Sequence, residues 1–320
     1  MSRVILLINR LPENATADEL DVLDQAAAVE QALDELGIHH DREYVDANLA
    51  KLAGRLYGET GAIAFNIVES VNNSDALVYF IPALLESMNF PFTGNPSEAM
   101  FLTTGKPLAK RLMQGAGIPT PGWWSADEAM NLDPGKRYIV KPSREDASVG
   151  IEEENVFHGS EAGILEEFRA RWGKHFFVEE YIPGREFNIS MLGGPDGPEV
   201  LPPAEMLFLD YPADKPAILG YTSKWDESTF EYQHTERTFD LAETDSPLIA
   251  EIELICHRCW SLFHLRGYAR VDFRVDELKR PYVLEINANP CISPDSGFYN
   301  AALKAGYTFT QVVERILNDR

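Results

Sequence analysis

The chain has 320 residues, 45% of them hydrophobic and 11% aromatic, which is enough for a sizeable core divided over two or three lobes. Its 28 Lys and Arg face 51 Asp and Glu, and a formal net charge of -23 would repel a phosphate backbone, so nucleic acid is excluded as an expected partner. No stretch approaches the ~20 apolar residues of a membrane span and no signal peptide is evident, so we expect a cytoplasmic protein without a membrane partner.

The first third of the chain has the pattern of an α/β unit. Short apolar runs that alternate with amphipathic stretches predict a parallel sheet with connecting helices. We expect strands at 4–8, 38–45 and 62–68 and helices at 18–36 and 77–88, the first helix ending at Gly37. The segment 91–96 is rich in Pro and Gly and predicts the end of this lobe.

The remainder of the chain mixes strands with a few helices. We expect helices at 106–114, 161–172, 246–265 and 309–317, and strands at 138–141, 176–181 and 186–192. Turn residues at 193–197 predict that the last of these strands enters an antiparallel sheet. The sequence thus predicts an α/β (α+β) fold of two or three lobes.

Three cysteines give no disulfide framework. Cys256 and Cys259 form a C-x-x-C pair, but no second Cys pair or spaced His pair accompanies it, as a metal site would require. Together with Ile252 and Phe263 the two cysteines make one stripe of a helix. The pattern therefore favours a core position over a metal or redox site.

Two runs near the C-terminus, 268–275 and 282–287, alternate with period two around a polar turn and predict a β-hairpin. Pairing Asp272 with Glu285 also pairs Arg270 with Asn287, which gathers these four side chains on one face. The other face would hold Val271, Phe273, Val275, Tyr282, Leu284 and Ile286. Two directly opposed carboxylates repel each other unless a cation lies between them.

A divalent cation would resolve that repulsion. Mg²⁺ takes carboxylate and amide oxygens and leaves positions for substrate phosphates, so Asp272, Glu285 and Asn287 are candidate ligands. Arg270 would be a fixed cation for a phosphoryl group or an oxyanion. The alternative is a solvent-facing hairpin of mixed charge.

Two further segments suit a nucleotide. The strand that ends in Lys141 runs into a loop of small residues up to Gly150, and such loops can bind phosphates through backbone N–H groups. A solvated strand edge is the alternative. The apolar strand 176–181 turns at Pro183-Gly184 and could offer adenine an apolar slot, with Glu186 on the ribose side.

Taken together, these motifs resemble the D-alanine:D-alanine ligase family of the ATP-grasp superfamily over nearly the whole chain. They are Val140-Lys-Pro-Ser-Arg144 with Ser148-Val-Gly150, Glu179-Glu-Tyr-Ile182 with Gly184-Arg-Glu-Phe187, Ala269-Arg-Val-Asp-Phe273, and Leu284-Glu-Ile-Asn-Ala-Asn-Pro290. The resemblance implies an N-terminal parallel-sheet pre-ATP-grasp domain at 1–96. It places the nucleotide between a central ATP-grasp lobe at 97–182 and a C-terminal lobe at 183–320.

The resemblance also implies a role for each matching residue. Phosphates would be held by Lys106, Lys141 and the loop 143–150 with Ser143, Ser148, Val149 and Gly150. Adenosine would be held by Glu179, Glu180, Tyr181, Ile182 and Glu186. Mg²⁺, or alternatively Mn²⁺, would be held by Asp272, Glu285 and Asn287. Arg270 and the backbone N–H of Cys291 would hold an oxyanion, with Lys224 and Ser296 near the phosphate and the acceptor carboxylate. The family usually has Gly in place of Cys291, so the implied contribution is its backbone.

The implied reaction is ADP-forming: ATP phosphorylates a carboxylate and an amine attacks the acyl phosphate, with D-alanyl-D-alanine as one candidate product. Family analogy also implies a homodimer. The segments 9–14 and 65–70 depart from the pattern where that family binds its first amino acid, which points to a different donor. The segment 289–296 near the acceptor and residues 146–147 of the phosphate lid also differ. Glu13, Asn66 and Glu69 are hypothesised donor contacts, with a plain loop role as the alternative. A small-molecule kinase and a non-catalytic nucleotide-binding protein are the competing functions.

Overall fold

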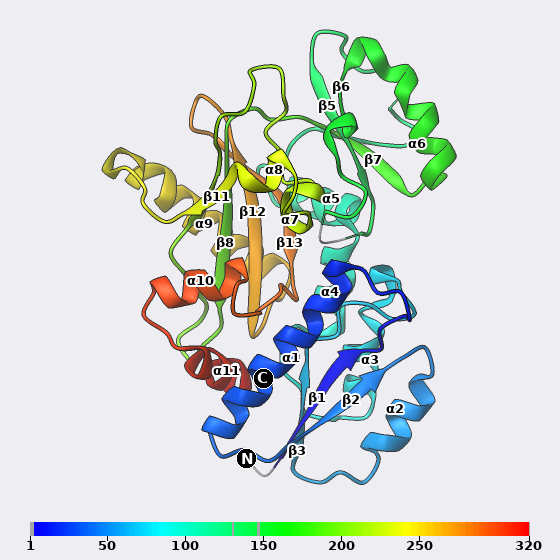
Figure 1. The fold of residues 1–320 in the computed structure, drawn as a ribbon, viewed down its shortest axis with the longest axis vertical. Coiled ribbons are helices and arrows are strands. Elements are labelled where there is room, and N and C mark those ends of the chain that lie inside the picture. Colours follow the sequence, from blue (N-terminus) through cyan, green and yellow to red (C-terminus); the bar gives the residue numbers. More distant parts are fainter. Residues whose placement is uncertain (1–2, 130, 146–147, 320) are drawn as a thin grey trace.

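The computed structural model describes residues 3–129, 131–145 and 148–319 and arranges them around three β-sheets (Figure 1). The N-terminal sheet has the order β2-β1-β3 with parallel pairs, as predicted. It consists of β1 (Arg3–Asn9), β2 (His40–Val45) and β3 (Ala62–Asn66), connected by α1 (Ala17–Glu35) and α2 (Leu49–Leu56) and followed by α3 (Phe80–Ser87).

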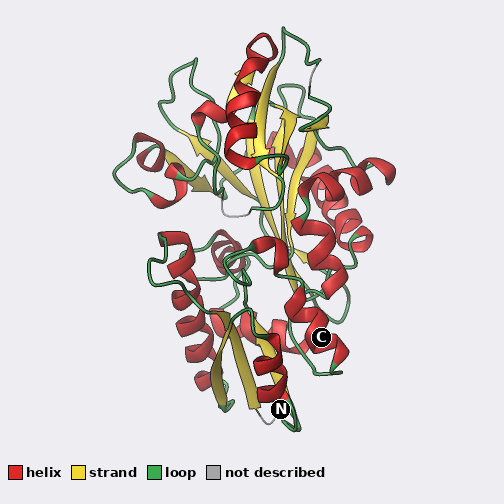
Figure 2. Ribbon diagram, turned by 90° about the vertical axis from the view of Figure 1, so that its right-hand side faces the viewer, coloured by secondary structure: helices red, strands yellow, loops and turns green. Residues whose placement is uncertain are grey.

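Helices cover both faces of this sheet, as Figure 2 shows. The side chains of Val4, Leu6 and Ile8 pack with α1, whereas those of Ile5 and Leu7 pack with α2 and α3. All five are completely buried. A strand that is buried on both faces has a continuous run of apolar residues, and this run allowed the strand at 4–8 to be predicted.

The central sheet is antiparallel and has the order β4-β7-β5-β6. Its strands are β4 (Trp123–Ser125), β5 (Arg137–Pro142), β6 (Val156–His158) and β7 (Phe176–Glu180). The helix α6 (Leu165–Trp172) packs on it through Leu165 and Phe168. The predicted helix 161–172 was wrong in its first turn, because Gly159–Ile164 form a 3-10 segment.

The C-terminal sheet is also antiparallel, with the order β11-β10-β8-β12-β13 and β9 beside β8. Its strands are β8 (Arg185–Leu192), β9 (Glu199–Val200), β10 (Ala204–Phe208), β11 (Thr235–Thr238), β12 (Tyr268–Val275) and β13 (Pro281–Asn287). The helix α9 (Ser246–Leu262) packs on it, and so do α4 (Ser97–Thr104) and α5 (Lys106–Gly115). The lobe divisions near residues 96 and 182 stay a prediction.

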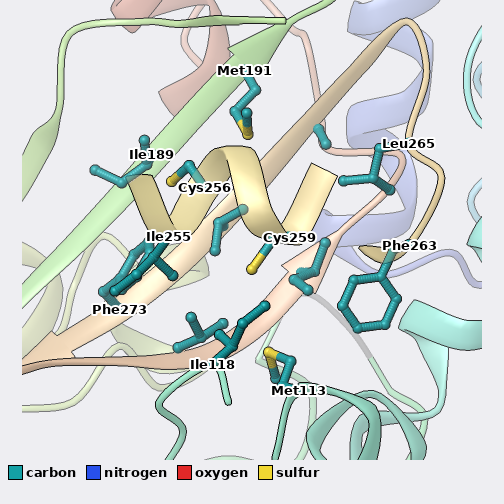
Figure 3. Packing of buried hydrophobic residues seen from close by; sticks show 14 of the residues in the cluster. Met113, Ile118, Ile189, Met191, Ile255, Cys256, Cys259, Phe263, Leu265 and Phe273 are labelled. Atoms are coloured by element: carbon teal, nitrogen blue, oxygen red, sulfur yellow. The ribbon is translucent and has the colours of Figure 1, made fainter. Parts of the chain in front are cut away.

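Cys256 and Cys259 lie on the buried face of α9, in a core cluster with Met113, Ile118 and Phe273 (Figure 3). Both are completely buried. Burial raises the pKa of the Cys259 thiol to about 12. The predicted core position is therefore confirmed.

The last segments of the chain return to the N-terminal lobe. The helices α10 (Gly297–Lys304) and α11 (Phe309–Asn318) pack with α1 in one apolar cluster that includes Val22, Phe298 and Ile316, and Figure 1 shows α11 beside α1. Two short helices, α7 (Thr222–Trp225) and α8 (Phe230–Gln233), precede β11. No helix in the described ranges has the length and apolar character that a bilayer crossing needs.

The hairpin of β12 and β13 agrees with the prediction at its polar end and departs from it beyond. Arg270 lies opposite Asn287 and Asp272 opposite Glu285, as predicted. The register then shifts, so that Phe273 lies opposite Val283, and the prediction that Tyr282 and Leu284 share a face with Phe273 was wrong. A β-bulge inserts one extra residue, which moves Val283 into the core and leaves Leu284 half-buried.

Asn95 ties the end of the first lobe to this hairpin. Its side-chain Nδ2 donates to the carbonyl oxygens of Tyr268 and Ala288, at 2.8 and 2.5 Å, and its Oδ1 accepts from the backbone N–H of Arg266 at 2.7 Å. Asn95 is 3% exposed. One amide thus satisfies three backbone groups, which fixes β12 and the end of β13 against the N-terminal lobe.

We expect Asn95→Asp to lower the free energy of unfolding by about 2–4 kcal/mol, because a carboxylate cannot donate to the two carbonyls and is itself buried. Urea unfolding measures the change. Asn14→Asp is the control, since Asn14 is exposed. Equal stability of the two variants would show that the Asn95 bonds contribute nothing.

Candidate active site

A cavity of about 1120 Å³ is lined by residues from all three sheets and their loops. Of the predicted site residues it is lined by Lys106, Lys141, Ser148, Val149, Gly150, Glu179, Glu180, Tyr181, Ile182, Glu186, Lys224, Arg270, Asp272, Glu285, Asn287, Cys291 and Ser296. Ser143 lies outside this lining, and its backbone carbonyl accepts from the N–H of Lys106 at 3.0 Å. Residues 146 and 147 of the predicted phosphate loop lie outside the described residues.

Lysines from two elements hold carboxylates in the cavity. Lys106, at the start of α5, places Nζ 2.8 Å from Oε2 of Glu285. Lys141, on β5, places Nζ 2.5 Å from Oε1 of Glu179. The first contact joins α5 to the hairpin, and the second joins two strands of the central sheet.

Glu179 lies between two lysines. Lys110 is one turn beyond Lys106 on α5, and its Nζ lies 2.7 Å from Oε2 of Glu179; each of the pair is 1% exposed. Burial would raise the pKa of Glu179, but Lys110 and Lys141 lower it below its ordinary value. Glu179 therefore stays ionised. We did not predict Lys110, although its i, i+4 spacing from Lys106 was a usable signal.

Asp272 is surrounded by donors. Arg270 donates to its two oxygens at 2.8 Å each, Asn188 donates to Oδ1 at 3.0 Å, and Asn287 donates to Oδ2 at 3.1 Å. Burial would lower the pKa of Arg270, but Asp272 raises it above its ordinary value. Asn188 was not predicted, although period two along β8 places it on the same face as Glu186.

The hairpin face suits a hard divalent ion. Asp272 and Glu285 bring carboxylates and Asn287 an amide, which is the oxygen-donor chemistry that Mg²⁺ prefers. Burial would raise the pKa of Glu285, but Lys106, Lys141 and Lys224 lower it, so it is ionised as a ligand must be. The described residues contain no group of three His, Cys, Asp or Glu able to hold a metal ion, so substrate oxygens would have to complete the shell.

Arg274 fixes the turn between β7 and β8. Its guanidinium donates to the carbonyl of Ile182 at 3.0 Å, to Glu186 at 3.0 Å and to the Tyr181 hydroxyl at 3.3 Å. The turn also requires Gly184, whose φ is 123° and where a Cβ would lie 2.2 Å from the carbonyl oxygen of Val275. We did not predict Arg274, although it continues the alternation of Arg270 and Asp272.

The other end of the cavity is formed by the N-terminal lobe and the loop after β13. Cys291 donates its thiol to Oδ2 of Asp21 at 2.8 Å. Burial raises the pKa of the Cys291 thiol, and Asp21 and Glu69 raise it further. The thiol is therefore a hydrogen-bond donor and is unsuited to act as a nucleophile.

The remaining predicted substrate contacts differ in position. Ser296 lines the cavity but also caps α10, accepting from the N–H of Tyr299 at 3.1 Å. Glu69 lines the cavity, whereas Glu13 is exposed and outside the lining. Asn66 is buried and its Oδ1 accepts from the N–H of Val68 at 3.3 Å, a local structural contact.

Residues 116–318 match the family model described as D-ala D-ala ligase C-terminus. The D-alanine--D-alanine ligase of Synechococcus sp. (strain JA-3-3Ab) is 30% identical to this chain, over 91% of this chain and 86% of the ligase. The D-alanine--D-alanine ligase of Maridesulfovibrio salexigens is 31% identical, over 92% of each chain. The crystal structure of the ligase from Bacillus anthracis complexed with ATP shares the fold, with a TM-score of 0.73 at 18% identity and coverage of 99% and 97%. The chain therefore belongs to the D-alanine:D-alanine ligase family of ATP-grasp proteins.

Proposed function

We propose that this family member is an ADP-forming ligase that activates a carboxylate as an acyl phosphate and joins it to an amine, with an amino-acid specificity different from that of D-alanine ligases. The observation that carries the proposal is the gathering of Lys106, Lys141, Lys224 and Arg270 in one cavity of a protein with a net charge of -23. Such a cluster opposes the overall repulsion of a polyanion such as ATP.

The proposed nucleotide contacts follow from the position of these groups. Lys106 and Lys141 would bind phosphates, with Ser148 to Gly150, while the segment from Glu179 to Ile182 and Glu186 would hold the adenosine. Asp272, Glu285 and Asn287 would hold Mg²⁺, which when bound supplies positive charge against the phosphate oxygens.

Lys224 and Arg270 would bind the reacting oxygens. Burial lowers the pKa of Lys224, and Arg270 lowers it further. Two neighbouring cations that repel each other favour an anion between them. Arg270 and the backbone N–H of Cys291 would stabilise the oxyanion that forms when the amine attacks, and Ser296 would contact the acceptor carboxylate.

Altered specificity is supported at the N-terminal lobe. The segments 9–14 and 65–70 differ from the family pattern, and Asn9 and Glu69 from them line the cavity. Binding selectivity depends on a few such contacts. The implied homodimer stays a prediction.

With ATP, Mg²⁺ and pooled L- and D-amino acids, we expect ADP and phosphate to be released and a dipeptide or amide to be detected by mass spectrometry. A ligase requires a carboxylate and an amine together. ADP release from one substrate without free phosphate would instead indicate a kinase, and no ADP release under any combination would indicate a non-catalytic nucleotide-binding protein.

We expect Asp272→Asn to reduce turnover at limiting Mg²⁺ by at least about tenfold, because one of two carboxylate ligands is lost. Part of the loss should be recovered at high Mg²⁺, whereas a defect in Arg270 alone would not respond to the ion. Glu277→Gln, in the exposed turn of the same hairpin, is the control. Full turnover of Asp272→Asn at limiting Mg²⁺ would refute the metal assignment.

A further inference from the structure

Lys110 is a buried lysine behind the wall of the cavity. Its side chain is 1% exposed and lies outside the cavity lining, whereas Glu179 and Lys141 belong to the lining. These three residues form what we call the Glu179 triad, in which Nζ of Lys110 and Nζ of Lys141 lie 2.7 and 2.5 Å from the two oxygens of the carboxylate. A ligand in the cavity would therefore be affected by Lys110 through Glu179 and not by direct contact.

The ammonium group of Lys110 is held on three sides. Its Nζ lies 2.7 Å from Oε2 of Glu179 and donates to Oγ1 of Thr120 at 2.9 Å. The hydroxyl of Thr120 donates in turn to the carbonyl of Val283 at 2.8 Å, which leaves its oxygen to accept from the lysine. The ring of Phe177 lies on the third side, with its centroid 6.0 Å from Nζ. These partners match the three donors of an ammonium group and fix Lys110 in place.

Lys141 is held less firmly than Lys110. It lies on β5 just before the loop 143–150, its side chain is 13% exposed, and it lines the cavity. Within the described ranges, its ion pair is the one with Glu179. Lys141 can therefore turn toward a phosphate in the cavity, whereas Lys110 cannot.

Two lysines on one buried carboxylate are more than a structural ion pair needs. Burial lowers the pKa of Lys110; Glu179 opposes this effect, and Lys141 adds to it. The second cation is therefore costly to bury, and apolar residues of similar volume often stabilise a protein as well as a buried ion pair does. Stability alone does not account for Lys110.

An exchange of partners by Lys141 does account for it. If Lys141 moved to a phosphate and Glu179 had no other cation, a buried carboxylate would be left unpaired, which is strongly unfavourable. With Lys110 in place, Glu179 keeps a counter-charge at 2.7 Å when Lys141 turns away. The carboxylate also keeps its orientation, because Oε2 stays beside Lys110.

We propose that Lys110 is a positioning residue for nucleotide binding, which supplies the permanent counter-charge of Glu179 and so allows Lys141 to exchange Glu179 for a phosphate oxygen. The inference rests on the proposed function, in which Lys141 binds phosphate and the segment from Glu179 to Ile182 holds adenosine. Lys110 thus favours ligands with phosphate groups over adenosine alone, without touching either.

Binding of ADP and of adenosine to the whole protein with Mg²⁺ tests this role. Calorimetric titration measures ADP, and displacement of a fluorescent ADP analogue measures adenosine. We expect Lys110→Met, which keeps the length of the side chain and removes the charge, to weaken ADP binding by about tenfold or more. Adenosine affinity should stay within about twofold, because adenosine has no phosphate and leaves Lys141 on Glu179. A purely structural role of Lys110 would change both affinities together or neither.

Arg111→Met is the matched control. Arg111 follows Lys110 on α5, is exposed, and places its guanidinium over the ring of Trp123. This variant removes the same charge from the same helix without altering the Glu179 triad, so ADP affinity should stay within about twofold. Lys110→Gln removes the charge but keeps a hydrogen-bond donor, and it gives the same comparison if Lys110→Met fails to fold.

A double-mutant cycle with Glu179→Gln separates action through the carboxylate from a direct effect of the Lys110 charge on phosphate. Without the carboxylate, Lys141 has no partner to leave, so Lys110→Met should then change ADP affinity by less than about twofold. An equal loss of ADP affinity with and without the carboxylate would overturn the inference. So would a Lys110→Gln protein that binds ADP as tightly as the unaltered protein.

Nucleotide binding and turnover together separate this inference from the proposed function. ADP binding that depends on Lys110, without turnover in any pool of amino acids, would keep the role of Lys110 and remove the ligase function. Turnover together with ADP binding that is indifferent to Lys110 would keep the ligase function and remove the role of Lys110. No ADP binding by the unaltered protein would overturn both.

Discussion

The opposition of Asp272 and Glu285 across β12 and β13 is the constraint around which the cavity is organised. Two carboxylates on neighbouring strands must be compensated, and the compensating cations are Arg270 on the same strand and Lys106 on α5. The ion pair of Lys106 with Glu285 also joins α5 to the hairpin.

In the part of the cavity that is proposed to hold the nucleotide, Glu179 and Glu285 are already paired with lysines before any ligand binds. Lys106 and Glu285 satisfy each other's charge, and Lys141 and Lys110 satisfy Glu179. A ligand that brings an anion together with a metal cation would offer each partner a new counter-charge. This exchange reconciles a cationic site with a strongly acidic protein, because the lysines are paired with carboxylates inside the cavity.

How far the sequence predicted this arrangement depends on the range of each interaction. Period two along 268–287 predicted the Asp272 and Glu285 register, but the bulge that moves Val283 inward depends on core packing and leaves no local pattern. The helix α2 was missed although Leu49, Leu52 and Leu56 have helical spacing, whereas α4 is apolar on several sides and lacks a distinctive period. Contacts such as Gln25 to Ile292 join distant positions and cannot be inferred from spacing.

The two ends of the cavity also differ in which segments of the chain form them. The part that is proposed to hold the nucleotide is built by ion pairs and hydrogen bonds among residues between Lys106 and Asn287, within the region of the hairpin and the central sheet. The part that is proposed to hold the amino acid joins α1 to the loop after β13, through Asp21 with Cys291 and Gln25 with Ile292. Under the proposed function, substitutions in the N-terminal loops would change the amino acid that is accepted while Lys106 and Lys141 keep their partners. Such a separation would let the chain retain the nucleotide motifs of its family and depart from the family where the amino acid is proposed to bind.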